Sequence, residues 1–248
     1  MIPPVVRALA GARPVRQVWV NEDGGRTYAV GDRYVKWTPP GTDGCGPDVA
    51  GEAARLEWAR AFTPVPSVLD HGSDHGGSWL VTAALPGENA IADRWLAEPA
   101  TAVAAIGTGL RALHDALPVA GCPFSWSAAE RVAAAAPAPS RWHPDHAGLT
   151  VTEALRRIAE PPPVDRLVVC HGDACAPNTL LRDDGRWLAH VDLDRLGVAD
   201  RWADIAVATW STEWNYGPGW SDALLDAYGV GPDPERTAYY RLLWDLSP

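Results

Sequence analysis

The chain has 248 residues, and 47% of them are hydrophobic, which is enough to form the core of one large domain or of two lobes. Its formal net charge of −10 argues against nucleic acid or an anionic membrane as a partner, because both attract basic patches. The sequence contains neither an apolar run of about 18 residues nor a secretory signal pattern, so we expect a cytoplasmic protein. We also expect a monomer or weak dimer. Its four cysteines lack metal-site spacing and are expected to be reduced thiols.

The N-terminal region predicts short antiparallel strands. Residues 16–20, 26–30 and 33–37 are strand-like, and Gly- and Asp-containing turns separate them. Lys36 lies near the end of the third strand between apolar neighbours, which would hold its charged end close to the sheet. Gly24 and Gly25 form a turn in which backbone N–H groups would approach a phosphate closely, although an ordinary hairpin turn explains them equally well.

The next segment predicts one helix and two further strands. Residues 48–58 have helical spacing, and Glu52 shares a face with Leu56, so its carboxylate points toward the sheet. A Pro-containing turn ends this helix. Residues 67–70 and 78–82 then form two strands, and the chain breaks at Pro86 and Gly87.

The rest of the chain is predicted to be mostly helical. The expected helices span residues 100–117, 128–136, 203–210, 222–228 and 233–245. The predicted fold class is therefore α+β, with a small antiparallel sheet and one helix in residues 1–82 and a mostly helical part in residues 83–248.

Residues 168–192 contain the densest group of chemically active side chains. An apolar run ends at His171 and Asp173, Asn178 follows five positions after Asp173, and Asp192 comes after a hairpin-sized gap. Phosphoryl transfer requires a carboxylate that orients the attacking hydroxyl and accepts its proton, and oxygen ligands for Mg²⁺. Asp173 fits the first role, and Asn178 with Asp192 fits the second. The alternative interpretation is a strand, a turn and a second strand whose acidic side chains merely face water.

Residues 171–178 and 191–206 resemble the catalytic loop and metal-binding segment of the aminoglycoside phosphotransferases, particularly their 3′ and 3″ branches. The resemblance extends over most of the chain, although relatives usually have glycine at the position of Asp194. It implies a two-lobed protein-kinase-like fold, with residues 1–82 as the nucleotide-binding lobe and residues 83–248 as the catalytic and substrate-binding lobe. It also implies ATP, with GTP as the alternative, as the phosphoryl donor and Mg²⁺ as the metal.

The resemblance also assigns residues to nucleotide binding. In such a fold, Lys36 contacts the α- and β-phosphates and pairs with a glutamate on the following helix, for which Glu52 is the candidate. The backbone groups of Thr82 and Ala84 take the positions that bind the adenine edge.

Further residues are expected around the reaction centre. Three side chains would support the catalytic loop, namely His171, Arg195 and Asp204. Asp204 would anchor the loop, and Arg195 would pair with a carboxylate. The candidate contacts for the ammonium groups of a cationic aminoglycoside are Asp145, Glu153, Glu213 and Asp245.

The expected function is phosphorylation of an aminoglycoside antibiotic, at the 3′-hydroxyl of a kanamycin- or neomycin-type substrate or at the 3″-hydroxyl of streptomycin, which would confer resistance. A kinase acting on another small metabolite, such as choline, homoserine or a sugar, would retain the same catalytic loop. A pseudokinase would lack the lysine, the aspartate or the asparagine, and this sequence contains all three.

Overall fold

The computed structural model describes residues 2–21, 24–40 and 49–246, and the chain divides into two compact units. The first unit comprises the chain up to Pro86 together with Asp192–Asp194. The second comprises Gly87–Val191 and the chain from Arg195 onward. The turn before Gly24 and the expected helix start at residue 48 lie partly outside the described residues.

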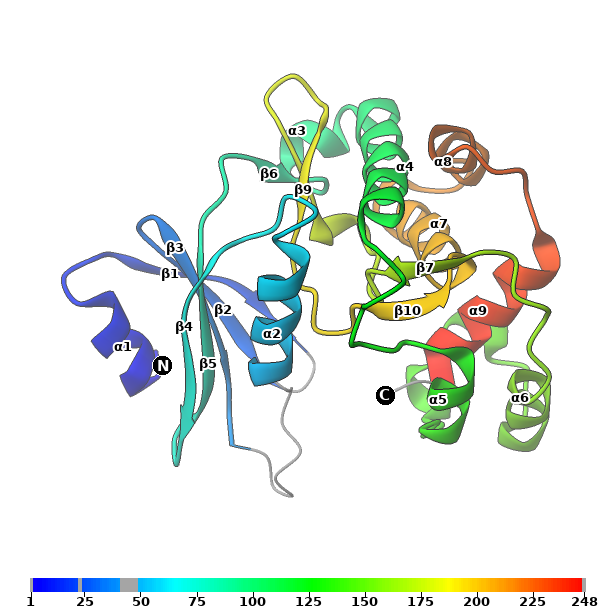
Figure 1. The fold of residues 1–248 in the computed structure, drawn as a ribbon, viewed down its shortest axis with the longest axis horizontal. Coiled ribbons are helices and arrows are strands. Elements are labelled where there is room, and N and C mark those ends of the chain that lie inside the picture. The colour runs from blue at the N-terminus through cyan, green and yellow to red at the C-terminus, as the bar shows by residue number, and fades with distance from the viewer. Residues whose placement is uncertain (1, 22–23, 41–48, 247–248) are drawn as a thin grey trace. The chain divides into compact units, whose positions relative to one another are not determined.

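The first unit is a five-stranded antiparallel sheet with a helix on each face (Figure 1). Its strands, in the spatial order β1-β2-β3-β5-β4, are β1 (Val15–Val20), β2 (Arg26–Val30), β3 (Arg33–Thr38), β5 (Gly77–Ala83) and β4 (Val68–Asp74). Helix α1 (Pro4–Ala10) covers one face and helix α2 (Val49–Ala59) covers the other.

Strand alternation gives the two faces of this sheet different roles. The core between the sheet and α1 consists of Val6, Ala10, Tyr28, Val30, Val35 and Val81. Successive side chains of a strand point to opposite faces, so Lys36, next to the buried Val35, points toward the face that α2 covers. The fold thereby separates an apolar face from a face that carries a charged group.

The second unit is mostly helical. Its α-helices are α3 (Asp93–Leu96), α4 (Pro99–Ala116), α5 (Ala128–Ala133), α6 (Val151–Ile158), α7 (Trp202–Tyr216), α8 (Ser221–Tyr228) and α9 (Pro234–Leu246). Short 3-10 helices span Pro139–Arg141 (η1), Pro144–His146 (η2) and Ala176–Asn178 (η3). Two small antiparallel sheets complete it, β7 (Leu167–Cys170) with β10 (Gly197–Asp200), and β6 (Glu88–Asn89) with β8 (Thr179–Leu181) and β9 (Trp187–His190).

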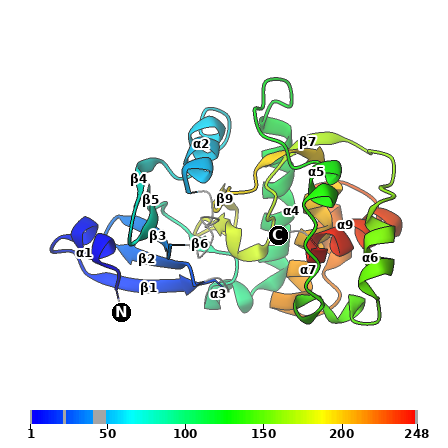
Figure 2. The same cartoon turned by 90° about the horizontal axis from the view of Figure 1, so that it is seen from below.

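Helix α7 is the central element of the second unit. Every residue from Trp202 to Thr212 is buried, as expected for a helix that is enclosed on all sides. It packs against α4, α8 and α9, and Figure 2 shows it from below beside α4 and α9. Among the described residues, no helix has both the length and the apolar character needed to span a bilayer.

The predicted α+β class is confirmed, and most strands and helices lie within a few residues of their predicted positions. The prediction was wrong at the end of α7, which continues to Tyr216 rather than stopping at Trp210. It missed α1, α3, α6, β6 and β10, which are short and depend on tertiary partners. It also ended β4 too early and α5 too late.

Helices α4 and α8 pack closely at Gly107. A Cβ atom on Gly107 would lie 2.7 Å from the backbone oxygen of Leu224 and 2.7 Å from the Cβ of Ala227. We therefore expect Gly107→Ala to lower the free energy of unfolding by about 1 kcal/mol or more, because overpacking exceeds the roughly 1 kcal/mol that alanine adds in helix propensity. Urea denaturation measures this, with Gly148→Ala as the control because its added Cβ would meet nothing within 4 Å. Equal losses in both variants would contradict the packing argument.

Candidate active site

Lys36 forms a charged cluster within the first unit. Its Nζ donates to Oε2 of Glu52 on α2 at 2.8 Å and to Oδ1 of Asp192 at 2.6 Å. Glu52 is buried, and the side chain of Lys36 is 21% exposed. The lysine therefore lies between two carboxylates, of which that of Glu52 is buried and that of Asp192 is partly exposed.

Burial and charge act in opposite directions on this cluster. Burial alone would lower the pKa of Lys36, but the nearby charges of Asp192 and Glu52 reverse this and raise the pKa well above its ordinary value. Burial raises the pKa of Glu52 to about 7, against the opposing effect of Lys36. Lys36 remains charged in either protonation state of Glu52, because Asp192 also pairs with it.

Asp192 has an unusual backbone conformation. It is the only non-glycine residue of the described chain with positive φ, at 64°. Aspartate tolerates the left-handed region better than most residues do. Asp194 adds negative charge to the same cluster, since it raises the pKa of both Lys36 and Glu52. Asp194 therefore makes this site more acidic.

The predicted catalytic loop, residues 171–178 and called the catalytic loop below, follows β7 in the second unit and is held by hydrogen bonds within itself and to Val191. The N–H of Asp173 donates to Nδ1 of His171 at 3.2 Å, and Nε2 of that ring donates to the carbonyl of Val191 at 3.0 Å. The Nδ2 of Asn178 donates to the carbonyl of Asp173 at 3.0 Å, which leaves the amide oxygen as the acceptor of that side chain. These bonds fix the backbone on both sides of Asp173.

Gly172 allows this loop to lie against Arg195. It has φ of 86°, and a Cβ at this position would lie 2.3 Å from the carbonyl oxygen of Arg195. No other residue fits without displacing backbone. Next to it, Oδ1 of Asp173 is buried and has no hydrogen-bond partner among the described residues.

Asp204 anchors the catalytic loop to α7. Its carboxylate accepts from the N–H of His171 at 2.6 Å and from the N–H of Gly172 at 2.9 Å. It also accepts from Nε2 of His114 at 2.9 Å, while Nδ1 of that histidine lies 2.8 Å from the hydroxyl of Tyr228. Burial would raise the pKa of Asp204, but the hydrogen bond from His114 and the other donors lower it, so the carboxylate stays ionised.

His114, Cys170 and Asp204 offer potential metal ligands within 4.8 Å of one another. The contacting atom of His114 is already hydrogen-bonded to Asp204. Burial, followed by the charge of Asp204, raises the pKa of the Cys170 thiol, whereas a metal needs the thiolate. This group is therefore a hydrogen-bonded core.

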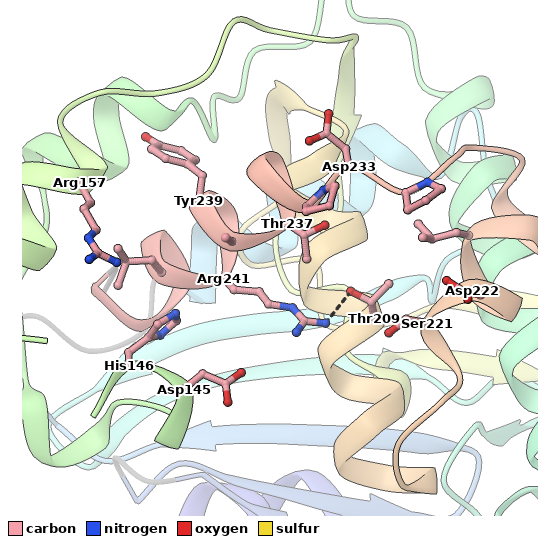
Figure 3. Close-up of a pocket in the computed structure, with 15 residues that line it drawn as sticks. Asp145, His146, Arg157, Thr209, Ser221, Asp222, Asp233, Thr237, Tyr239 and Arg241 are labelled. Carbon is pink, nitrogen blue, oxygen red and sulfur yellow. Dashed lines mark hydrogen bonds between the residues drawn. The ribbon is translucent and has the colours of Figure 1, made fainter. Parts of the chain in front are cut away.

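A cavity of about 630 Å³ lies within the second unit, and one of its lining residues is a predicted substrate contact (Figure 3). Asp145 lines it directly. Asp245 accepts from His146, a lining residue, at 2.5 Å and from the backbone N–H of His143 at 2.9 Å. Glu213 bonds to two other lining residues, Arg241 at 3.2 Å and Ser221 at 2.9 Å.

Two predicted residues have partners that differ from the expectation. Glu153 bonds to Arg156 and Arg157 on its own helix, which lowers its pKa to about 2, and it does not line the cavity. The guanidinium of Arg195 lies 5.6 Å and 5.3 Å from the ring centroids of Trp126 and Trp244, and among the described residues it forms no ion pair. The predicted carboxylate partner is thus replaced by aromatic faces.

The predicted adenine-binding backbone is partly engaged by the sheet. Thr82 lies in β5 and pairs with Tyr34 and Val68 on its two neighbouring strands. The N–H of Ala84 donates to the carbonyl of Asp32 at 2.9 Å, because the β3–β5 pairing continues past the end of β5. This N–H is therefore not available to a ligand in this structure.

Comparison with known proteins identifies the chain's family. Residues 5–240 match the model of the phosphotransferase enzyme family. The chain belongs to this family. The resemblance to the aminoglycoside phosphotransferases noted in residues 171–178 and 191–206 is confirmed.

Several members of the phosphotransferase family are similar to this chain over most of its length. An aminoglycoside 3′-phosphotransferase of Streptomyces fradiae is 39% identical over 233 residues, covering 85% of this chain and 84% of the relative. A streptomycin 3″-kinase of Streptomyces griseus is 35% identical over 251 residues, covering 90% and 88%. A solved structure of a Streptomyces rimosus aminoglycoside phosphotransferase with ADP and streptomycin is 29% identical, with a TM-score of 0.73, and covers 97% and 95%.

Within this phosphotransferase, the sequence-predicted residues form three groups. The first is the lysine cluster of Lys36, Glu52 and Asp192. The second is the catalytic loop with its anchor, namely His171, Asp173, Asn178 and Asp204. The third is the set at the cavity, namely Asp145, Glu213 and Asp245. Sequence reasoning missed Ser211, whose hydroxyl accepts from the backbone N–H of Ala176 at 2.8 Å. No sequence pattern marks a lone helical serine as a loop contact.

We expect Asp204→Asn to destabilise the phosphotransferase by about 3 kcal/mol. An amide at this position offers one oxygen where three donors converge, and its NH₂ group faces a donor, so buried N–H groups lose their partner. Urea unfolding monitored by tryptophan fluorescence measures the loss. Asp226→Asn, at an exposed position on α8, is the matched control and should change stability by less than about 0.5 kcal/mol. A wild-type midpoint for Asp204→Asn would rule out the anchoring role.

Proposed function

We propose that this chain is an ATP-dependent aminoglycoside O-phosphotransferase that confers antibiotic resistance. The preferred acceptor is the 3′-hydroxyl of a kanamycin- or neomycin-type substrate, and the 3″-hydroxyl of streptomycin is the second candidate. The observation that carries the proposal is the Asp173 carboxylate, whose Oδ1 is shielded from water and has no donor among the described residues. A relative named aminoglycoside 3′-phosphotransferase, 39% identical, supports the substrate class.

The proposed chemistry assigns one role to each group of residues. Asp173 accepts the proton of the attacking hydroxyl as the oxygen–phosphorus bond forms, and ADP leaves. The charge of Lys36 binds the α- and β-phosphates, and Glu52 orients it. In the structure, Lys36 is bonded to Asp192. We therefore expect ATP phosphates to exchange with that carboxylate as the partner of the lysine.

The oxygen donors fit a hard divalent cation. The amide group of Asn178 uses its nitrogen to bond the carbonyl of Asp173, so its oxygen is the atom left for a ligand. Asp192 would supply the carboxylate ligand. When bound, Mg²⁺ would neutralise charge on the β- and γ-phosphates. GTP is the alternative phosphoryl donor. Because the reaction needs a nucleoside triphosphate, we expect it to take place in the cytoplasm.

The acceptor would bind through carboxylates. The net charge of −10 suits a polycationic substrate, and Asp145 is the most exposed of the candidates, with 57% of its side chain accessible. Asp245 and Glu213 are bonded to protein groups and would act mainly by holding the residues that line the cavity.

The proposed function is tested by measuring ATP consumption with kanamycin, neomycin, streptomycin and choline. We expect turnover with at least one aminoglycoside and none with choline. Expression in a susceptible bacterium should raise the inhibitory concentration of the same antibiotic. Turnover with choline alone would replace the proposal with a small-metabolite kinase.

We expect Asp173→Ala to reduce kcat by about 10²–10⁴-fold, because the attacking hydroxyl loses its proton acceptor. Nucleotide affinity should change little, since the lysine cluster does not include Asp173. Steady-state kinetics and calorimetric titration with ATP separate the two effects. Asp183→Ala, an exposed position in the β8–β9 turn, serves as the control. Full turnover by Asp173→Ala would remove Asp173 from this role.

Asp192→Ala should instead abolish the Mg²⁺ dependence of nucleotide binding, because it removes a proposed metal ligand and leaves Lys36 paired with Glu52 alone. Titration with ATP in the presence and absence of Mg²⁺ measures this. An unchanged difference between the two titrations would show that the metal binds elsewhere.

A further inference from the structure

Helix α7 holds the catalytic loop at two points rather than one. Asp204 binds the N–H groups of His171 and Gly172, just before Asp173. About two helical turns later on the same face, Oγ of Ser211 accepts from the N–H of Ala176, just after Asp173, at 2.8 Å. The residue proposed as the proton acceptor therefore lies between two attachments to one rigid helix.

The hydroxyl of Ser211 is used differently from those of its neighbours. Thr209 and Thr212 each donate to a carbonyl of their own helix, at 2.8 Å and 2.7 Å, which is the usual behaviour of hydroxyls within helices. Ser211 is 1% exposed, and its oxygen accepts from a segment more than thirty positions earlier in the chain. Its hydrogen bond is thus a tertiary contact.

Asn215, one turn further along α7, sets the orientation of this hydroxyl. Its Nδ2 donates to the carbonyl of Ser211 at 2.7 Å and to Oγ of Ser211 at 3.2 Å. The oxygen of Ser211 therefore accepts two hydrogen bonds, and its own hydrogen remains to be donated. This arrangement fixes the rotamer from both sides.

Cys175 lies between Asp173 and Ala176 in the chain. Burial, followed by the charge of Asp173, raises the pKa of the Cys175 thiol. Because Asp173 is only three residues from the N–H of Ala176 that Ser211 holds, a displacement at Ser211 would reach the Asp173 carboxylate through a short stretch of backbone.

We propose that Ser211, oriented by Asn215, is a positioning residue that fixes the second half of the catalytic loop and thereby the carboxylate of Asp173. The inference rests on the proposed role of Asp173. Ala176 is fully buried, so without the serine hydroxyl its N–H has no water to bond and the loop must shift to satisfy it. A shift of about 1 Å in a reacting group can reduce the rate by about 10²-fold.

The test separates an effect on kcat from an effect on the binding of ATP. For Ser211→Ala, we expect kcat with the accepted aminoglycoside to fall by about 10- to 100-fold, while the affinity for ATP with Mg²⁺ stays within about twofold. Ser211→Thr retains the hydroxyl and should recover most of the rate. Thr212→Val is the matched control, because it removes an adjacent buried hydroxyl that bonds only within α7, and kcat should not change. Thermal unfolding of each variant corrects for the folded fraction.

A double-mutant cycle tests whether Asn215 acts through Ser211. Asn215→Ala should lower kcat on its own and have no further effect in the Ser211→Ala background. An unchanged kcat for Ser211→Ala, additive effects of the two substitutions, or an equal loss in Thr212→Val would each overturn the proposal. If Ser211→Ala does not fold, the Asn215→Ala variant tests the proposal instead. A wild-type kcat together with an unchanged Tm for Asn215→Ala would reject the proposal. Full activity of Asp173→Ala would reject the proposed function independently of these results.

Discussion

One buried carboxylate, that of Asp204, is the interaction on which the reaction centre depends. It has no contact with water, and it accepts from two backbone N–H groups of the catalytic loop and from the ring of His114. A buried charge is tolerated only when donors surround it, so the loop, α4 and α7 must meet in one arrangement for the unit to be stable. The position of Asp173 follows from the requirement to satisfy this charge.

A second constraint acts in the first unit, where Lys36 lies between Glu52 and Asp192. The cluster contains more acid than base, and Asp194 increases the excess. Like charges in a partly buried site repel, so the cluster gains from any additional cation. In a phosphotransferase that uses a nucleotide with a divalent metal, the metal would supply this cation. The nucleotide phosphates would supply an anion that competes with Asp192 for the lysine.

Much of the architecture was predictable because its causes are local. The Gly31 turn, with φ of 61°, and the alternation around Val35 and Lys36 determine the central hairpin and the face of the lysine. Helix α4 could be recognised from the spacing of its apolar residues. By contrast, β6 has only two residues and exists because it pairs with β8. The extension of α7 to Tyr216 was missed because Trp214 and Asn215 have weak helix propensity, which tertiary packing overrides.

The sequence by itself determined which chemical groups are present and their spacing along the chain. Asp173 and Asn178 are five residues apart, and one hydrogen bond joins them within a single loop, so this part of the site follows from local geometry. The tertiary structure alone decided the partners of the other residues. Asp245 is bonded to His143 and His146, and Arg195 lies over two tryptophans, because contacts between residues distant in sequence depend on how the elements pack and not on any periodic pattern. The attachment of Ala176 to Ser211 belongs to the same class, since nothing in the sequence around either residue specifies the other.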